Sequence, residues 1–192
     1  MLIFEVPPFE GPKIIRMERH GDARGYFAEV WRQDILGAAG IDRVFCQENQ
    51  SFSTEPGTVR GLHFQLGPAA QAKLIRCIRG AIFDVIVDLR RDSPTFGRHA
   101  AIELSAENWV QLYVPQQFAH GYCTLEPNTE VLYKASSYYD RAAERGIAWD
   151  DPGLGIAWPV DRARAVLSER DRCNPSLASY FQQTAPSPLP LI

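Results

Sequence analysis

The sequence predicts a single, mainly β domain, arranged as a sandwich or barrel with short helices at its periphery. Short segments with period-two alternation recur at regular spacing along the middle of the chain, and Gly, Pro, Asn or Ser residues bound them. Helical periodicity is weak and confined to the two ends. A length of 192 residues, with 45% hydrophobic and 22% charged residues, is typical of one globular domain with one substantial core.

The clearest strand is predicted over residues 82–89. Its odd-numbered side chains are all apolar, and they alternate with an even-numbered set that includes Asp84 and Asp88. We expect this strand to be half-buried, because it follows Arg79-Gly80 and ends before a turn-rich segment. Five further strands are predicted, at residues 73–78, 99–104, 109–114, 120–125 and 130–136.

Two short helices are predicted near the ends of the chain. One covers residues 32–39 and ends at Gly40, and the other covers residues 176–182 with Ser176 as its N-cap. The domain is expected to span residues 1–183, and residues 184–192, which include three prolines, are expected to form a C-terminal tail.

Composition narrows the functional classes. The 20 basic and 23 acidic residues give a net charge of −3, which offers no electrostatic footprint for nucleic acid or a membrane surface. The N-terminal segment lacks a basic region, and no apolar run approaches the roughly 20 residues of a membrane span. The four cysteines, at positions 46, 77, 123 and 173, form no Cys-x-x-Cys pair and are expected to be isolated buried thiols. We therefore expect a reducing, cytoplasmic setting.

The segment Val59-Arg60-Gly61-Leu62-His63-Phe64-Gln65 carries the strongest functional signal, and Lys73 follows ten residues after its histidine. We expect Arg60, His63 and Lys73 to lie on neighbouring pieces of one sheet, where they can activate a carbonyl group. Gly61 indicates a bend or a close approach to the backbone at this point.

Two windows, residues 57–80 and 115–120, resemble the paired motifs of the cupin family, a jelly-roll barrel or double-stranded β-helix. Metal-binding cupins need His-x-His, a glutamate and a later His, whereas this chain has Gln65 for the second His and Lys73 for the glutamate. A protonated lysine adds positive charge and no lone pair, so a metal is not expected. His63, Lys73 and His120 are instead expected to face inward as an acid–base site.

A closer resemblance covers residues 22–171 and is specific, because many motifs occur in one order. The chain resembles the dTDP-4-dehydrorhamnose 3,5-epimerase family. The matching motifs are Asp22-Ala23-Arg24-Gly25-Tyr26-Phe27, Gln47-Glu48-Asn49, Arg60 to Gln65, Gln71 to Arg76, Phe83 to Arg90, Phe118-Ala119-His120-Gly121, Tyr133, Glu144 to Trp149, Asp151-Pro152 and Leu167-Ser168-Glu169-Arg170-Asp171.

The resemblance implies that His63 is a general base and Tyr133 a general acid on the opposite face of the sugar. It implies that Asp171 orients His63 and that Lys73 stabilises the oxyanion formed when the C4 ketone enolises, with no metal and no cofactor. A proton beside a ketone becomes removable when a preorganised cation meets the developing charge. A carboxylate on one ring nitrogen fixes the histidine tautomer. Without the resemblance, the simpler interpretation of each residue is structural: Tyr133 as a core aromatic, Asp171 as a solvated loop carboxylate and Lys73 as an exposed strand-end lysine.

The resemblance also implies a binding set for the nucleotide sugar. Arginine forks suit phosphate oxygens, and an arginine stands at 170 where the family usually has lysine. The implied partner is a second copy in a homodimer, whose Arg24 and Glu29 reach the neighbouring pocket. The implied contacts are Arg24, Arg60 and Arg170 for the diphosphate, Glu29, Gln47, Asn49, His120 and Glu144 for the sugar and base, and Tyr138 for stacking on thymine.

The function implied is epimerisation of dTDP-4-keto-6-deoxy-D-glucose at C3 and C5 to dTDP-4-keto-L-rhamnose, in deoxysugar biosynthesis of the dTDP-L-rhamnose type. Within the same barrel group, a C3- or C5-only epimerase or a 3,4-ketoisomerase of an antibiotic sugar pathway remains open. From other classes, a non-catalytic sugar-nucleotide-binding cupin and a metal-dependent cupin oxygenase or isomerase remain open.

Overall fold

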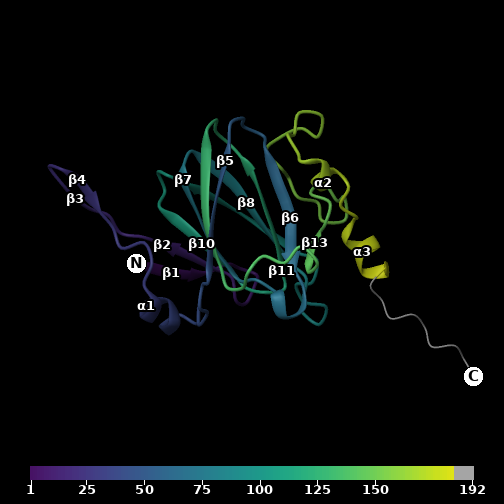
Figure 1. Cartoon of the computed structure of the whole chain (residues 1–192), viewed down its shortest axis with the longest axis horizontal. Coiled ribbons are helices and arrows are strands. Elements are labelled where there is room, and N and C mark those ends of the chain that lie inside the picture. The colour runs from purple at the N-terminus through teal and green to yellow at the C-terminus, as the bar shows by residue number, and fades with distance from the viewer. Residues whose placement is uncertain (184–192) are drawn as a thin grey trace, which may run out of the picture.

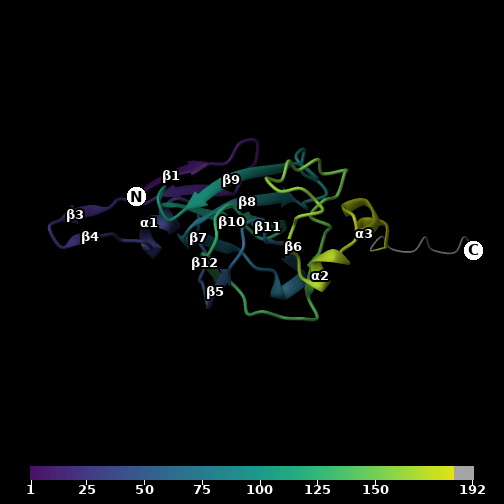
Figure 2. The same cartoon turned by 90° about the horizontal axis from the view of Figure 1, so that it is seen from above.

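The computed structural model of the chain describes residues 1–183, which form two antiparallel sheets facing each other (Figures 1 and 2). The predicted tail, residues 184–192, lies outside the described residues. The prediction of a mainly β, jelly-roll type barrel with short peripheral helices is confirmed. The six-stranded sheet has the order β1 (Leu2–Glu5), β2 (Lys13–Arg16), β10 (Val110–Val114), β7 (Lys73–Arg79), β12 (Thr129–Ala135) and β5 (Gln47–Ser53).

The facing sheet has five strands, in the order β13 (Glu144–Gly146), β6 (Val59–Gln65), β11 (Phe118–Thr124), β8 (Ala81–Asp88) and β9 (His99–Ser105). A hairpin of β3 (His20–Asp22) and β4 (Gly25–Phe27) extends away from the barrel in both views (Figures 1 and 2). The helical elements are α1 (Gln33–Ala38), the 3-10 turn η1 (Gly67–Ala69), α2 (Glu169–Arg172) and α3 (Leu177–Gln183).

Both predicted helices are confirmed within one residue at each end, and Ser176 caps α3 by accepting a hydrogen bond from the backbone N–H of Ser179. All six predicted strands are present, with ends shifted by at most two residues. None of the described helices is long and apolar enough to cross a membrane.

Apolar side chains fill the space between the sheets and also cover their outer faces. The inner core joins Ile75 and Leu112 of the six-stranded sheet to Ile86 of the five-stranded sheet. A second cluster lies on the outer face of the five-stranded sheet, where Ile147 and Tyr180 pack. The α1 segment covers part of the other outer face. Burial of this kind contributes about 25 cal/mol per Å² of apolar surface and fixes the strands that carry the site.

Strand β8 corrects one prediction, since it is buried on both faces and not half-buried. Its Ile82 and Ile86 belong to the inner core, while Val85 and Val87 pack under the C-terminal segment. Asp84 is completely buried in this strand. A polar residue in a covered strand needs a partner, and Asp84 has one in the site described below.

The prediction that Arg60, His63 and Lys73 share one sheet is wrong. Arg60 and His63 lie on β6 of the five-stranded sheet, and Lys73 begins β7 of the six-stranded sheet. The physical reason is that the connection containing η1 carries the chain across from one sheet to the other. The three side chains therefore meet across the barrel instead of along one wall.

Gly61 allows the close approach that the sequence indicates. Its φ is +128°, and a Cβ atom there would lie 2.6 Å from the Gly121 Cα of β11. The close approach holds β6 and β11 together, where His63 and His120 are direct cross-strand partners.

The cysteines depart from the expectation of buried thiols. Cys77 and Cys123 are buried, but Cys46 and Cys173 are exposed, because both lie outside the cores, before β5 and after α2. Burial raises the pKa of the Cys77 thiol to about 11, as it does for Cys123.

Candidate active site

A cavity of about 460 Å³ lies between the two sheets and collects six of the predicted site residues. From the five-stranded sheet come Arg60, His63 and His120, and from the six-stranded sheet come Lys73 and Tyr133. Asp171 reaches the cavity from α2. The rest of the lining is Ser51, Thr58, Val59, Tyr122, Val166, Leu167 and Ser168.

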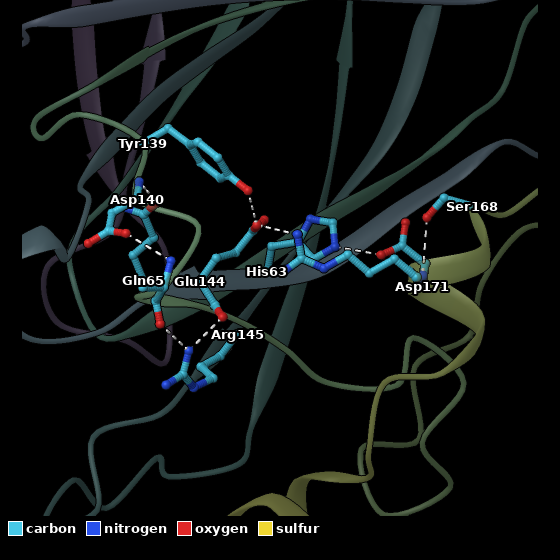
Figure 3. A network of polar contacts seen from close by, with 10 residues as sticks. His63, Gln65, Tyr139, Asp140, Glu144, Arg145, Ser168 and Asp171 are labelled. Atoms are coloured by element: carbon cyan, nitrogen blue, oxygen red, sulfur yellow. Dashed lines mark hydrogen bonds and ion pairs between the residues drawn. The ribbon is translucent and has the colours of Figure 1, made fainter.

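His63 and Asp171 form a hydrogen-bonded pair (Figure 3). The His63 Nε2 atom lies 2.5 Å from Asp171 Oδ1, and the backbone N–H of Asp171 donates to Ser168 Oγ at 3.1 Å. Ser168 is the N-cap of α2, so the cap fixes the carboxylate at the first turn. Burial raises the pKa of Asp171, but its hydrogen bonds, above all with His63, outweigh burial and the pKa is lowered. The carboxylate is therefore ionised against the imidazole.

Lys73 supplies a cation inside the cavity. Burial lowers the pKa of Lys73 to about 8, while the charges of Asp84 and Glu144 oppose this fall. Its ammonium lies 5.9 Å from the centre of the Tyr133 ring. A strand-end lysine here is enclosed by the barrel instead of standing in solvent, because β7 begins at the cavity wall.

Asp84 is the partner of His120. Both oxygens of the completely buried Asp84 carboxylate lie within 3.0 Å of His120 Nε2, at 3.0 and 2.9 Å. Burial raises the pKa of Asp84, while the charges of His120 and Lys73 lower it. Two histidine–carboxylate pairs thus lie on neighbouring strands. Both histidines line the cavity, but 27% of the His63 side chain is exposed and only 8% of the His120 side chain.

Tyr133 lies on the sheet opposite His63 and lines the same cavity. Burial raises the pKa of its phenol, the charge of Glu144 adds to this, and Arg60 opposes it. The phenol is therefore protonated at neutral pH and can give a proton.

Arg60 bridges the two sheets. Its guanidinium donates to the backbone carbonyl of Phe52 at 3.1 Å and to Ser53 Oγ at 3.4 Å. Gln47 and Asn49 lie on the same strand, β5, and the Gln47 amide donates to Asn49 Oδ1 at 2.9 Å. Asn49 is the direct cross-strand partner of Tyr133, so these amides continue the wall beyond the cavity.

Glu144 and Tyr139 lie beside His63 (Figure 3), and Arg170 joins them through an ion pair with Glu144. The Tyr139 hydroxyl donates to Glu144 Oε2 at 2.6 Å, and the Arg170 guanidinium binds the same oxygen. Tyr138, which directly precedes Tyr139, is 71% exposed. Three predicted binding residues therefore lie near the cavity without lining it.

Gln65 does not line the cavity; its side chain fixes the neighbouring loops. Its buried amide donates to the carbonyls of Ala69 and Tyr138 and accepts from the N–H of Asp140 (Figure 3). Across residues 1–183, no group of three or more His, Cys, Asp and Glu side chains is arranged to hold a metal ion.

Neither Arg24 nor Glu29 lines the cavity of its own chain. Arg24 lies at the turn of the β3–β4 hairpin, pairs with Asp22 and has a side chain that is 90% exposed. Glu29 follows the hairpin and lies 3.9 Å from Arg32. The structure therefore does not bring these two predicted residues to the site.

Comparisons with known proteins match this arrangement. The family model described as dTDP-4-dehydrorhamnose 3,5-epimerase matches residues 7–179. A dTDP-4-dehydrorhamnose 3,5-epimerase from Sinorhizobium fredii is 51% identical over 165 residues, which is 86% of this chain and 84% of that protein. The chain belongs to the dTDP-4-dehydrorhamnose 3,5-epimerase family. The resemblance seen in the sequence motifs is thereby confirmed.

Two solved structures extend the likeness to the fold of this epimerase family. The crystal structure of a dTDP-4-dehydrorhamnose 3,5-epimerase from Bacillus anthracis, with TDP and PPi bound, has a TM-score of 0.88 and 46% identity and covers 92% of this chain and 99% of its own. A 3'-monoepimerase from Streptomyces bikiniensis, in complex with dTDP-quinovose, has a TM-score of 0.85 and 36% identity and covers 92% and 88%.

The sequence reasoning missed Asp84, Ser51 and Tyr122 of this family member. Asp84 has a visible signal, since a charged residue in the middle of an apolar strand needs a buried partner. Ser51 and Tyr122 have no such signal, because a serine and a tyrosine in a β-rich chain are common in any position.

Proposed function

We propose that this protein epimerises dTDP-4-keto-6-deoxy-D-glucose at C3 and C5 to dTDP-4-keto-L-rhamnose through enolate intermediates. The observation that carries the proposal is the His63–Asp171 pair on one wall of a cavity whose opposite wall holds Tyr133, with Lys73 between the sheets. An epimerase needs a base and an acid on opposite faces of the sugar, together with a charge for the enolate oxygen.

His63 is proposed to take the proton from the carbon beside the C4 ketone. The ionised Asp171 on Nε2 keeps Nδ1 as the acceptor nitrogen and stabilises the imidazolium that forms. A positioned base contributes about 10² to 10⁴ in rate. The electron pair of the broken C–H bond becomes the enolate, with negative charge on O4.

Lys73 is proposed to meet that negative charge. With a pKa of about 8, its ammonium is present at neutral pH, and burial leaves it few water molecules to compete with an enolate. Tyr133 then gives its proton to the same carbon from the opposite face, which inverts the centre. His63 loses its proton and the Tyr133 phenolate regains one from solvent before the second carbon reacts.

The nucleotide half is proposed to extend from the cavity toward the open Tyr139 side. Arg60 and Arg170 supply cations for the diphosphate, while Gln47, Asn49, His120 and Glu144 supply polar contacts for the sugar and base. Tyr138 is exposed and suits stacking on thymine.

A homodimer completes this proposal. The β3–β4 hairpin extends away from its own barrel (Figure 2), and the exposed Arg24 at its turn and the nearby Glu29 are proposed to reach the cavity of a second copy. We further propose a cytoplasmic location and a reaction without metal or cofactor, since Lys73 and Gln65 stand where metal-binding cupins need ligands.

The proposal is tested by incubating the protein with dTDP-4-keto-6-deoxy-D-glucose in deuterated water and following deuterium at C3 and C5 by NMR. We expect deuterium at both carbons, no incorporation with His63→Ala, and some exchange without inversion with Tyr133→Phe. Incorporation at C3 alone would indicate a monoepimerase, and none at either carbon a binding protein. Metal analysis and activity after chelation test the expected absence of a cofactor.

A further inference from the structure

Two hydroxyl groups in the cavity have no part in the reaction described so far. Ser51 lies on β5 of the six-stranded sheet, and Tyr122 lies on β11 of the five-stranded sheet. Their oxygens are 2.7 Å apart, and both residues line the cavity that holds His63 and Tyr133. The pair therefore spans the two walls between which the sugar is proposed to bind.

The two hydroxyls carry two hydrogens, and only one of them is used in a good hydrogen bond. One hydroxyl donates to the other at 2.7 Å. The other contact formed by either hydroxyl in the described part of the chain is from Ser51 Oγ to the Val131 carbonyl at 3.5 Å, which is long for an O–H···O bond. One hydroxyl hydrogen is thus free to bond an oxygen atom of a ligand in the cavity. Such a bond is favoured, because an unpaired donor in a confined site is costly.

The surroundings of Tyr122 favour a neutral donor. Only 5% of Tyr122 is exposed, and burial raises the pKa of its phenol to about 12. Arg60 lowers the pKa of Tyr122, whereas Tyr133 and Asp84 add to the rise. Since Lys73 already supplies a cation for the enolate, a neutral donor on this wall suits an uncharged oxygen of the ligand, such as a hydroxyl.

We propose that Ser51 and Tyr122 form a subsite that donates a hydrogen bond to a ring hydroxyl of the 4-keto-6-deoxyhexose and so orients the sugar between His63 and Tyr133. The inference rests on the proposed function and deepens it. The pair acts as a positioning element: a ring held at a hydroxyl presents the same carbons to the base on one wall and the acid on the other.

The test uses dTDP-6-deoxy-D-glucose, which keeps the ring hydroxyls but has no ketone and does not turn over. Its affinity is compared with that of dTDP alone by calorimetry, for the wild type, Tyr122→Phe and the double variant Ser51→Ala/Tyr122→Phe. The double variant removes both hydroxyls together, so it leaves no buried partner unsatisfied and protects folding. The control is Tyr113→Phe, which removes the hydroxyl of a buried tyrosine outside the cavity.

Both variants are expected to bind dTDP-6-deoxy-D-glucose about 10-fold more weakly and dTDP with unchanged affinity, as one neutral hydrogen bond implies. Tyr113→Phe is expected to bind both ligands as the wild type does. An equal loss for both ligands would mean that the pair only clamps the sheets, and no loss for either would mean that it touches no sugar; each result overturns the inference. Wild-type deuterium exchange, run in parallel, separates these outcomes from a failure of the proposed function.

Discussion

Replacing Lys73 with methionine is expected to stabilise the protein at neutral pH while it removes most of the catalysis. Burial lowers the pKa of Lys73 from its ordinary value of 10.5 to about 8. One pKa unit corresponds to about 1.4 kcal/mol, so holding the ammonium in the cavity costs the folded state about 3 kcal/mol at pH 7. Methionine fills a similar volume without the charge. Loss of the attraction for Asp84 reduces the gain, and we expect a net increase of about 1 to 3 kcal/mol in the free energy of unfolding.

The pH dependence of the stability gain in Lys73→Met distinguishes removal of the buried charge from better packing of methionine. A group whose folded pKa is lowered, as that of Lys73 is, loses its proton in the folded state first, so the wild type regains stability between pH 8 and pH 10.5. The penalty is expected to fall from about 3 kcal/mol at pH 7 to about 1 kcal/mol at pH 10. The stability difference between variant and wild type shrinks accordingly.

The assay is denaturant unfolding of both proteins at pH 7 and pH 10, with Lys134→Met as the matched control. Lys134 follows Tyr133 on β12 but pairs with Glu48 away from the catalytic cavity, so its removal is expected to give no such pH dependence. Deuterium exchange at pH 7 is expected to fall about 10² to 10³-fold in Lys73→Met. A stability difference that is constant with pH, or a less stable variant at pH 7, would refute the reasoning.

Three further changes test other parts of the site. Because the charge of Asp84 raises the pKa of Lys73, Asp84→Asn is expected to move the alkaline limb of the pH–kcat profile below that of the wild type; an unchanged limb contradicts this. Asp171→Asn is expected to lower kcat by about 10² or more with little change in KM. Because the folded pKa of Asp171 is lowered, its contribution to stability exists above pH 3.8 and disappears in acid. The urea unfolding curves of the wild type and the variant should therefore converge in acid. Gly61→Ala is expected to lower Tm, since its Cβ meets Gly121 at 2.6 Å, whereas Gly37→Ala, with no atom within 4 Å, leaves Tm unchanged or raises it.

The strands were predictable where period-two patterning reports burial, and β5 shows the limit of that signal. The residues of β5 that face inward are Gln47, Asn49, Ser51 and Ser53, all polar; Ser51 lines the cavity, and none of the four belongs to a hydrophobic core. Alternation of apolar and polar residues is therefore absent in this strand. The polar side chains that suit β5 to sugar binding also remove the alternation by which a strand is predicted from sequence.

Placement across the barrel was the part that local sequence could not supply. His63 and Lys73 are ten residues apart, but whether a turn returns to the same sheet or crosses to the facing one depends on long-range pairing. Asp84 and His120 pair over 36 residues for the same reason. The order of motifs along the whole chain predicted that His63, Tyr133 and Asp171 belong to one site, whereas residue spacing alone did not.

The two histidine–carboxylate pairs show how burial divides one motif into two functions. His63 and His120 are direct cross-strand partners, and each has a carboxylate within 3.0 Å of Nε2. Asp171 is held ionised by its hydrogen bonds, and its histidine opens to the cavity, so this pair suits proton removal. Asp84 is completely buried and its histidine is nearly so; burial raises the pKa of Asp84, while the charges of His120 and Lys73 oppose the rise, so we infer that this second pair serves to place a carboxylate beside Lys73. The buried cation that an enolate needs is costly alone, and the sealed carboxylate next to it is what keeps its proton in place at neutral pH.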